Sequence, residues 1–225
     1  LLIRVSYSAL AQNATGMTMT TGVHEGSGRR RLAVCCSVIV MLAAGCASES
    51  DIRCAVTAIN ENFRADYEVI LKQYGTKEFK VTRAEAYDAV RISLARVGMT
   101  VEAQDPVLGY VSVYGPAPRP LDLNEWRQAA AADLPRARQI IGPCVGMFSN
   151  FFTFEPEGLE VVIGATVVEA PDGTAISYTA RMREIAPPRS GIPRREYLPP
   201  TAVWMGLNKM WAELDREFKA TYRRP

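Results

Sequence analysis

The sequence contains a single histidine, His24, and five cysteines among its 225 residues. A histidine-based catalytic triad would depend on that one histidine. After Cys46 only two cysteines remain, too few for the usual His/Cys zinc site. A glycine-rich phosphate loop is also missing, because Gly142-Pro-Cys-Val-Gly146 is irregular and has no lysine. We therefore expect a protein that is not an enzyme and that holds no metal and no cofactor.

The most apolar stretch near the N-terminus is too short to cross a bilayer. Leu32–Ala44 contains 13 uncharged, mostly apolar residues, whereas a membrane-spanning helix needs roughly 20. Three arginines, residues 29–31, precede this stretch, and small residues lead from it into Cys46. A basic segment, a short apolar core and a small-residue end predict a secretory signal peptide. The alternative is a buried apolar helix that begins at Leu32.

The end of this stretch, Leu42-Ala-Ala-Gly-Cys46, resembles the lipobox of bacterial lipoproteins. In that family the cysteine sulfur receives a diacylglyceryl group, the chain is cut just before it, and the new N-terminus is often acylated, for example by palmitate. The resemblance implies that residues 1–45, an N-terminal extension and signal peptide, are removed. Cys46 would then carry the lipid and residues 46–51 would form a tether to the membrane. The absence of aspartate after Cys46 implies the outer membrane facing the periplasm, with the inner membrane as the alternative.

Removal of residues 1–45 changes what the composition means. The remaining 180 residues have no histidine, and 22 basic and 23 acidic side chains shift the formal charge from +2 to −1. This balance gives no reason to expect binding to nucleic acid. Cys54 and Cys144 remain as an even pair in an oxidising compartment, which predicts a disulfide; two separate buried thiols are the alternative. We expect residues 52–225 to form one periplasmic domain.

Apolar periodicity and capping signals predict four helices. Residues 56–74 carry apolar side chains at three- and four-residue steps, although 67–74 could instead be an edge strand. Capping boxes at Thr82 and Asp122 open two further helices, and Pro135 should break the second of these. Trp126, near the start of that helix, is expected to be partly exposed. A final helix carries an apolar stripe that includes Trp204, Leu207, Trp211, Leu214 and Phe218.

Alternating side chains predict six strands. They are Glu78–Val81, the hairpin Met99–Gln104 and Tyr110–Tyr114, Ser149–Glu155, and a second hairpin over Leu159–Val167 and Ile176–Met182. In the last strand apolar residues alternate with serine, threonine and arginine, so one side of the sheet should be in contact with water.

These elements predict an α+β fold: an antiparallel sheet with helices packed on one face and a long C-terminal helix across its dry side. From Glu78 onward the element order resembles the helix-grip arrangement. Small envelope lipoproteins often have it, including the C-module of the lipoprotein of the outer-membrane β-barrel assembly machine. The resemblance is in element order and lipobox only, so it implies no site.

Four sets of residues are candidate sites, each with a structural alternative. Arg189, Arg194 and Arg195 could contact anionic lipid headgroups or an acidic partner, or be a solvated surface. Trp204, Leu207 and Trp211 could line a cleft for an apolar ligand, which needs about 300 Å³, or be core. Tyr110, Ser112 and Tyr114 share a strand face that is either a cleft lining or a half-exposed sheet surface. Glu155, Glu157 and Glu160 are either paired carboxylates or a solvated turn.

Taken together, these features favour a non-catalytic, lipid-anchored envelope protein that is held to the membrane through its N-terminal lipid and binds an envelope protein partner. The alternative is a module that binds a small apolar molecule or lipid between the sheet and the C-terminal helix. A third hypothesis, a carboxylate-dependent cell-wall hydrolase, requires two carboxyl groups about 5 to 10 Å apart in a cleft.

Overall fold

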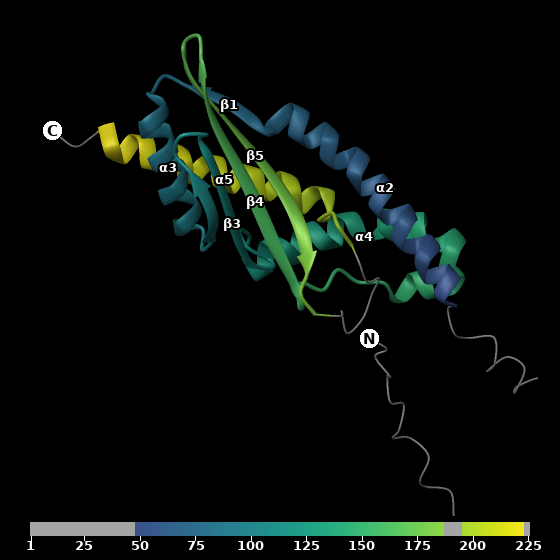
Figure 1. Ribbon diagram of the computed structural model, residues 1–225. Coiled ribbons are helices and arrows are strands. Elements are labelled where there is room, and N and C mark those ends of the chain that lie inside the picture. Colours follow the sequence, from purple (N-terminus) through teal and green to yellow (C-terminus); the bar gives the residue numbers. More distant parts are fainter. Residues whose placement is uncertain (1–47, 187–194, 223–225) are drawn as a thin grey trace, which may run out of the picture. The chain divides into compact units, whose positions relative to one another are not determined.

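The computed structural model describes residues 48–186 and 195–222, which belong to one compact unit (Figure 1). The predicted signal peptide, His24 and Cys46 lie outside the described residues. The elements follow the order α2 (Glu49–Tyr74), β1 (Thr76–Phe79), α3 (Arg83–Arg96), β2 (Thr100–Asp105), β3 (Tyr110–Pro116), α4 (Leu123–Val145), the 3₁₀ helix η1 (Gly146–Phe151), β4 (Leu159–Ala170), β5 (Gly173–Glu184) and α5 (Pro200–Tyr222).

Five strands form one antiparallel sheet in the order β1-β5-β4-β3-β2. The long strands β4 and β5 pair over their whole length, from Leu159 opposite Glu184 to Ala170 opposite Gly173. Gly173 has a φ of +150°, and a side chain there would collide with the carbonyl oxygen of Phe79 in β1. Glycine therefore allows the hairpin turn to lie close to the edge strand. This architecture confirms the predicted α+β fold with an antiparallel sheet.

The sheet has one dry face, which α3 and α5 cover (Figure 1). On this face Ile163 of β4 and Ile176 of β5 are fully buried, as alternation along the strands predicts. The ring of Trp211 on α5 packs against Tyr178, with 4.5 Å between the ring centroids. Its Nε1 donates a hydrogen bond to the carbonyl of Tyr74 at a distance of 2.8 Å. The C-terminal helix thus lies across the dry face, as expected.

Helix α2 is helical throughout Glu49–Tyr74, so the edge-strand alternative for residues 67–74 is wrong. The helix packs against α4 and α5, and it also protects one edge of the sheet. Strand β1 pairs only with residues 174–177 of β5. Farther along that edge, the backbone N–H of Ala180 donates to the hydroxyl of Tyr67, at 3.1 Å. The backbone N–H of Ala180 is therefore not available to a further strand.

The helix starts predicted at Thr82 and Asp122 are confirmed, whereas α2 begins at Glu49, so residues 49–51 of the predicted tether are helical. Thr82 caps α3 and Asp122 caps α4, each in a reciprocal capping box with the glutamate three residues later. A third box, in which Ser48 pairs with Asp51, opens α2. Such boxes satisfy backbone N–H groups that have no partner within the helix, so they fix where each helix begins.

The strand predicted for Ser149–Glu155 is wrong. Residues up to Phe151 form η1, and residues 152–156 are irregular. Phe152 and Phe154 are buried, but their backbone carbonyls bind side chains instead of a neighbouring strand. Trp126 Nε1 donates a hydrogen bond to the carbonyl of Phe154 at 2.9 Å, and Arg138 donates to the carbonyl of Phe152. Trp126, expected to be partly exposed, is therefore buried at 2% exposure.

The break predicted at Pro135 is also wrong, because α4 continues through Pro135 and Pro143 to Val145. Proline removes one backbone hydrogen bond, here to the carbonyl of Ala131. Both Pro135 and Ala131 are exposed, so water can replace the missing donor. Buried Ala137 and Ile141 hold the following turns in the core. Tertiary packing thus outweighs the local cost of the proline.

Candidate functional site

The predicted disulfide between Cys54 and Cys144 is present, with 5.6 Å between the two Cα atoms. It links the beginning of α2 to the end of α4, two helices that also pack against each other. The bond therefore joins parts of the chain that are 90 residues apart.

Arg195 is buried, contrary to its predicted role as a surface contact. Its side chain is 3% exposed, and its guanidinium lies 5.8 Å and 5.5 Å from the ring centroids of Phe152 and Phe154. Burial lowers the pKa of Arg195 to about 10, so it remains charged at neutral pH. An arginine enclosed in this way stabilises the irregular segment after η1 and is not available to a partner. Arg189 and Arg194 lie outside the described residues.

Trp204, Leu207 and Trp211 do not line a cleft together. Leu207 and Trp211 are in the core, whereas Trp204 is 43% exposed because it lies at the edge of the helical stripe. The space beside Leu207, enclosed by residues such as Ile163 and Met210, has a volume of about 10 Å³. An apolar ligand of ordinary size would need about 300 Å³ or more. The space between sheet and helix beside Leu207 is thus filled by side chains.

Two of the three carboxylates predicted as a possible pair, Glu155 and Glu157, line one open pocket of about 360 Å³ beside α4, whereas Glu160 does not. Glu160 forms an ion pair with Arg183 on the wet side of the sheet, at 2.7 Å. Glu157 is exposed at the turn before β4, whereas Glu155 and Glu160 are half-buried. Among the described residues, no group of three or more His, Cys, Asp or Glu side chains could hold a metal ion.

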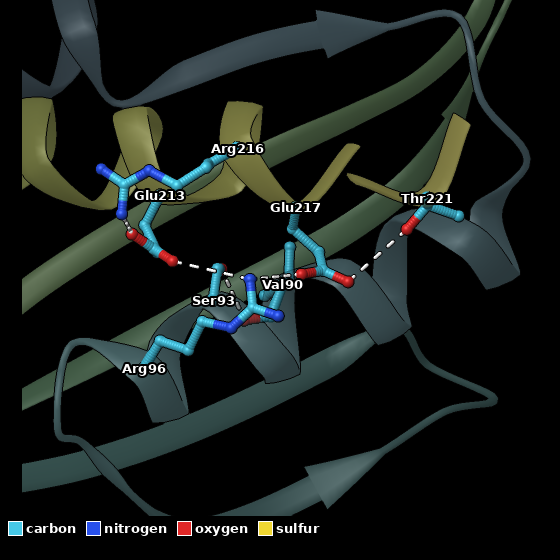
Figure 2. A network of polar contacts seen from close by, with 7 residues as sticks. All are labelled: Val90, Ser93, Arg96, Glu213, Arg216, Glu217 and Thr221. Atoms are coloured by element: carbon cyan, nitrogen blue, oxygen red, sulfur yellow. Dashed lines mark hydrogen bonds and ion pairs between the residues drawn. The ribbon is translucent and has the colours of Figure 1, made fainter. Parts of the chain in front are cut away.

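A buried carboxylate pair that was not predicted from the sequence does occur on α5 (Figure 2). Glu213 and Glu217, one helical turn apart, are 8% and 6% exposed. Between them lies the guanidinium of Arg96 from the end of α3, with Nη1 3.6 Å from Glu213 Oε1 and 2.5 Å from Glu217 Oε2. Arg216 also pairs with Glu213. The sequence signal was two glutamates four residues apart beside the apolar stripe of α5.

This network of ion pairs holds α3 and α5 together. The guanidinium of Arg96 lies between the two carboxylates, and both glutamates are held by ion pairs with arginine. The contact between Arg96 and Glu217 is an ion pair without an aligned hydrogen bond, since Glu217 Oε2 has no partner in hydrogen-bond geometry. The three charges connect α3 to α5 above the dry face (Figure 2). We assign them to stability rather than to catalysis.

The sheet surface opposite α3 and α5 is exposed over much of its area (Figure 1). We call it the open face; its residues are Tyr110, Ser112, Tyr114, Val162, Thr166, Val168, Ser177, Thr179 and Arg181, of which Ser112 is buried and Val168 is 45% exposed. At its centre Gly164 lies between Ser112 and Thr179 in register, and a side chain at Gly164 would crowd the Thr179 hydroxyl. The open face therefore combines a shallow polar centre with exposed tyrosine at Tyr110, which is 41% exposed.

Four strands contribute to an ion network at one end of the open face. Arg183 of β5 contacts Glu160 of β4 at 2.7 Å and Glu102 of β2 at 3.2 Å, and Glu102 accepts a hydrogen bond from Ser112 of β3. Hydrogen bonds to Glu160, and secondarily to Glu102, raise the pKa of Arg183 above its ordinary value. The network orients charged groups across the sheet, although Arg183 itself is half-exposed.

Next to the open face, β2 is an uncovered edge of the sheet. Within the described chain β2 pairs only with β3, and a bulge lies between Val101 and Ala103. The turn after it exposes Val107 and Leu108, which are 81% and 69% exposed. Arg83 of α3 holds this turn by donating hydrogen bonds to the carbonyls of Val107 and Val167. We call Val107 and Leu108 the turn pair; it is apolar, exposed and fixed in place.

Comparison with protein-family models, curated proteins and solved structures finds no match for this chain. Among the described residues, no helix meets the length and hydropathy needed to span a bilayer. Function must therefore be argued from the surfaces of the domain.

Proposed function

We propose that this protein is a lipid-anchored component of the bacterial cell envelope, attached through Cys46, whose non-catalytic domain binds a protein partner in the periplasm. The lipobox-like Leu42-Ala-Ala-Gly-Cys46 supports the anchor, with the outer membrane as the expected location. The open face together with the uncovered edge of β2 supports the partner site. The hydrolase alternative has in its favour only the open pocket that Glu155 and Glu157 share, and the apolar-ligand alternative has no cavity of the required size beside Leu207.

The observation that carries the partner site is the fixed, exposed turn pair beside an unpaired strand edge. Val107 and Leu108 remain in water although Arg83 holds their turn firmly against β4. An unpaired strand offers backbone donors and acceptors to an extended peptide, and neighbouring apolar side chains add contact area. A protein partner can therefore add a strand to β2 and cover the turn pair.

A pull-down from bacterial envelopes tests this function. The tagged, lipidated full chain should recover one envelope protein in stoichiometric amount. The double variant Val107→Asp, Leu108→Asp should lose that protein, because each new carboxylate would be buried at the contact. Val69→Asp is the matched control: Val69 is 64% exposed on α2, away from the sheet edge.

Recovery of the same partner by all three proteins would place the site elsewhere. Recovery of abundant porins alone, whatever the variant, would contradict the partner-binding function. Circular dichroism of each variant checks that the exposed substitutions leave the fold intact.

A further inference from the structure

A second cluster of large apolar side chains is exposed on η1. Met147, Phe148 and Phe151 are 83%, 41% and 76% exposed. Residues three apart in a 3₁₀ helix share one side, so Phe148 and Phe151 point the same way. We call these three residues the η1 tip. The tip lies within a stretch of 16 residues, 139–154, that carries no charge. Exposed apolar clusters of this kind mark interaction surfaces.

The disulfide links the η1 tip to the part of the chain that follows the proposed lipid anchor. The tip follows directly after Cys144, whose Cα is 5.6 Å from that of Cys54. In Figure 1 the end of α4 accordingly lies beside the beginning of α2. From Cys46 to Glu49 an extended chain spans at most about 11 Å, and the helix from Glu49 to Cys54 adds about 7.5 Å. The disulfide therefore holds the tip at the end of the domain nearest the lipid.

We infer that Met147, Phe148 and Phe151 insert into the surface of the bilayer that holds the lipid of Cys46. This inference rests on the proposed lipid anchor and adds a second membrane contact to it. Apolar and aromatic side chains partition into the headgroup and acyl boundary, and a lipid-tethered domain meets that boundary at high local concentration. The η1 tip thus restricts how the domain is oriented over the membrane.

The contact is apolar rather than electrostatic. No charged side chain occurs in η1, and the first turns of α2 carry Glu49 and Asp51 together with one exposed arginine, Arg53. Anionic headgroups therefore meet no excess of positive charge on these two elements, and salt screening should have little effect. Insertion should be equal in zwitterionic and in partly anionic vesicles.

Tryptophan quenching by brominated lipid tests the inference on the acylated full chain. Phe151→Trp places a reporter on the η1 tip, and Val107→Trp is the matched control at a similarly exposed turn position. Each protein is purified from membranes and reconstituted into vesicles of phosphatidylcholine or of acyl-brominated phosphatidylcholine. The emission of the unsubstituted protein is subtracted, because it already contains three tryptophans.

The added emission of Phe151→Trp should fall at least about twofold in brominated vesicles, as expected for a side chain at the acyl boundary. Val107→Trp should be unchanged, and high salt should alter neither result. Equal emission in both vesicle types for acylated, vesicle-bound Phe151→Trp would overturn the inference and leave the anchor intact. If the added tryptophan of Phe151→Trp is shielded from solvent in detergent and the native mass of the protein is doubled, the η1 tip contacts a second copy of the chain. That result would also overturn the inference. Failure of the anchor itself would be distinct, because the protein would lack acyl chains and would not float with vesicles.

Discussion

Replacing Cys54 and Cys144 by serine removes the covalent link between α2 and α4. The two cysteines are 90 residues apart, and the chain-entropy relation gives a loss of about 4.6 kcal/mol in the free energy of unfolding for a loop of that length. Domains are typically stable by about 5 to 15 kcal/mol, so the loss is a large share of the total. For a domain of this size it corresponds to a fall of about 9 to 18 °C in Tm.

Guanidinium unfolding followed by circular dichroism measures this loss. The double serine variant and the wild type with a reducing agent should give the same lowered midpoint. The wild type with its disulfide intact is the reference for both measurements. A decrease of less than about 1 kcal/mol in the free energy of unfolding would show that the disulfide does not stabilise the fold by restricting the conformations of the unfolded chain.

Two further substitutions test the packing around α4. Trp126→Phe should lower the free energy of unfolding by about 1 to 3 kcal/mol, because the buried carbonyl of Phe154 loses its hydrogen-bond donor. Trp204→Phe, at an exposed site, should change the free energy of unfolding little. Equal losses for the two variants would contradict the difference in burial between Trp126 and Trp204. Burial raises the pKa of Asp133, which accepts two hydrogen bonds from Thr201 at the beginning of α5. The folded state therefore binds a proton at Asp133 more tightly than the unfolded state does. As pH falls from neutral through the raised pKa toward 3.8, the free energy of unfolding of the wild type should rise relative to that of Asp133→Asn. Thermal melts across this range check the sign, and a relative loss would contradict it.

Features encoded within a few residues could be predicted from the sequence. The capping boxes at Thr82 and Asp122 are local hydrogen-bond patterns, and the structure places both helices where those patterns predict. The alternation along β4 and β5 likewise identifies the dry and wet faces, because successive side chains of a strand point to opposite sides. The fold class followed from these local signals and their order.

Features decided by distant parts of the chain could not be predicted. Phe152 and Phe154 alternate like residues of a strand, but Trp126 and Arg138 of α4 donate hydrogen bonds to their carbonyl oxygens. Burial of Arg195 depends on the same rings. No local pattern reveals these contacts.

The candidate surfaces show the same division. The open face could be expected from alternation, whereas its ion network could not, since Arg183 and Glu102 are 81 residues apart. Of the η1 tip, Phe151 falls within the segment wrongly predicted as a strand, whereas Met147 and Phe148 precede that segment. Its proximity to the proposed anchor depends on the disulfide, which was itself predicted from cysteine count and compartment.

The lipid anchor at Cys46 is the central claim, because it fixes the compartment and the position of both proposed surfaces. Mass spectrometry of the full chain extracted from bacterial membranes tests it most directly. We expect a protein that begins at Cys46, carries two or three acyl chains and has Cys54 joined to Cys144. An N-terminus upstream of Cys46, or an unmodified Cys46, would contradict it.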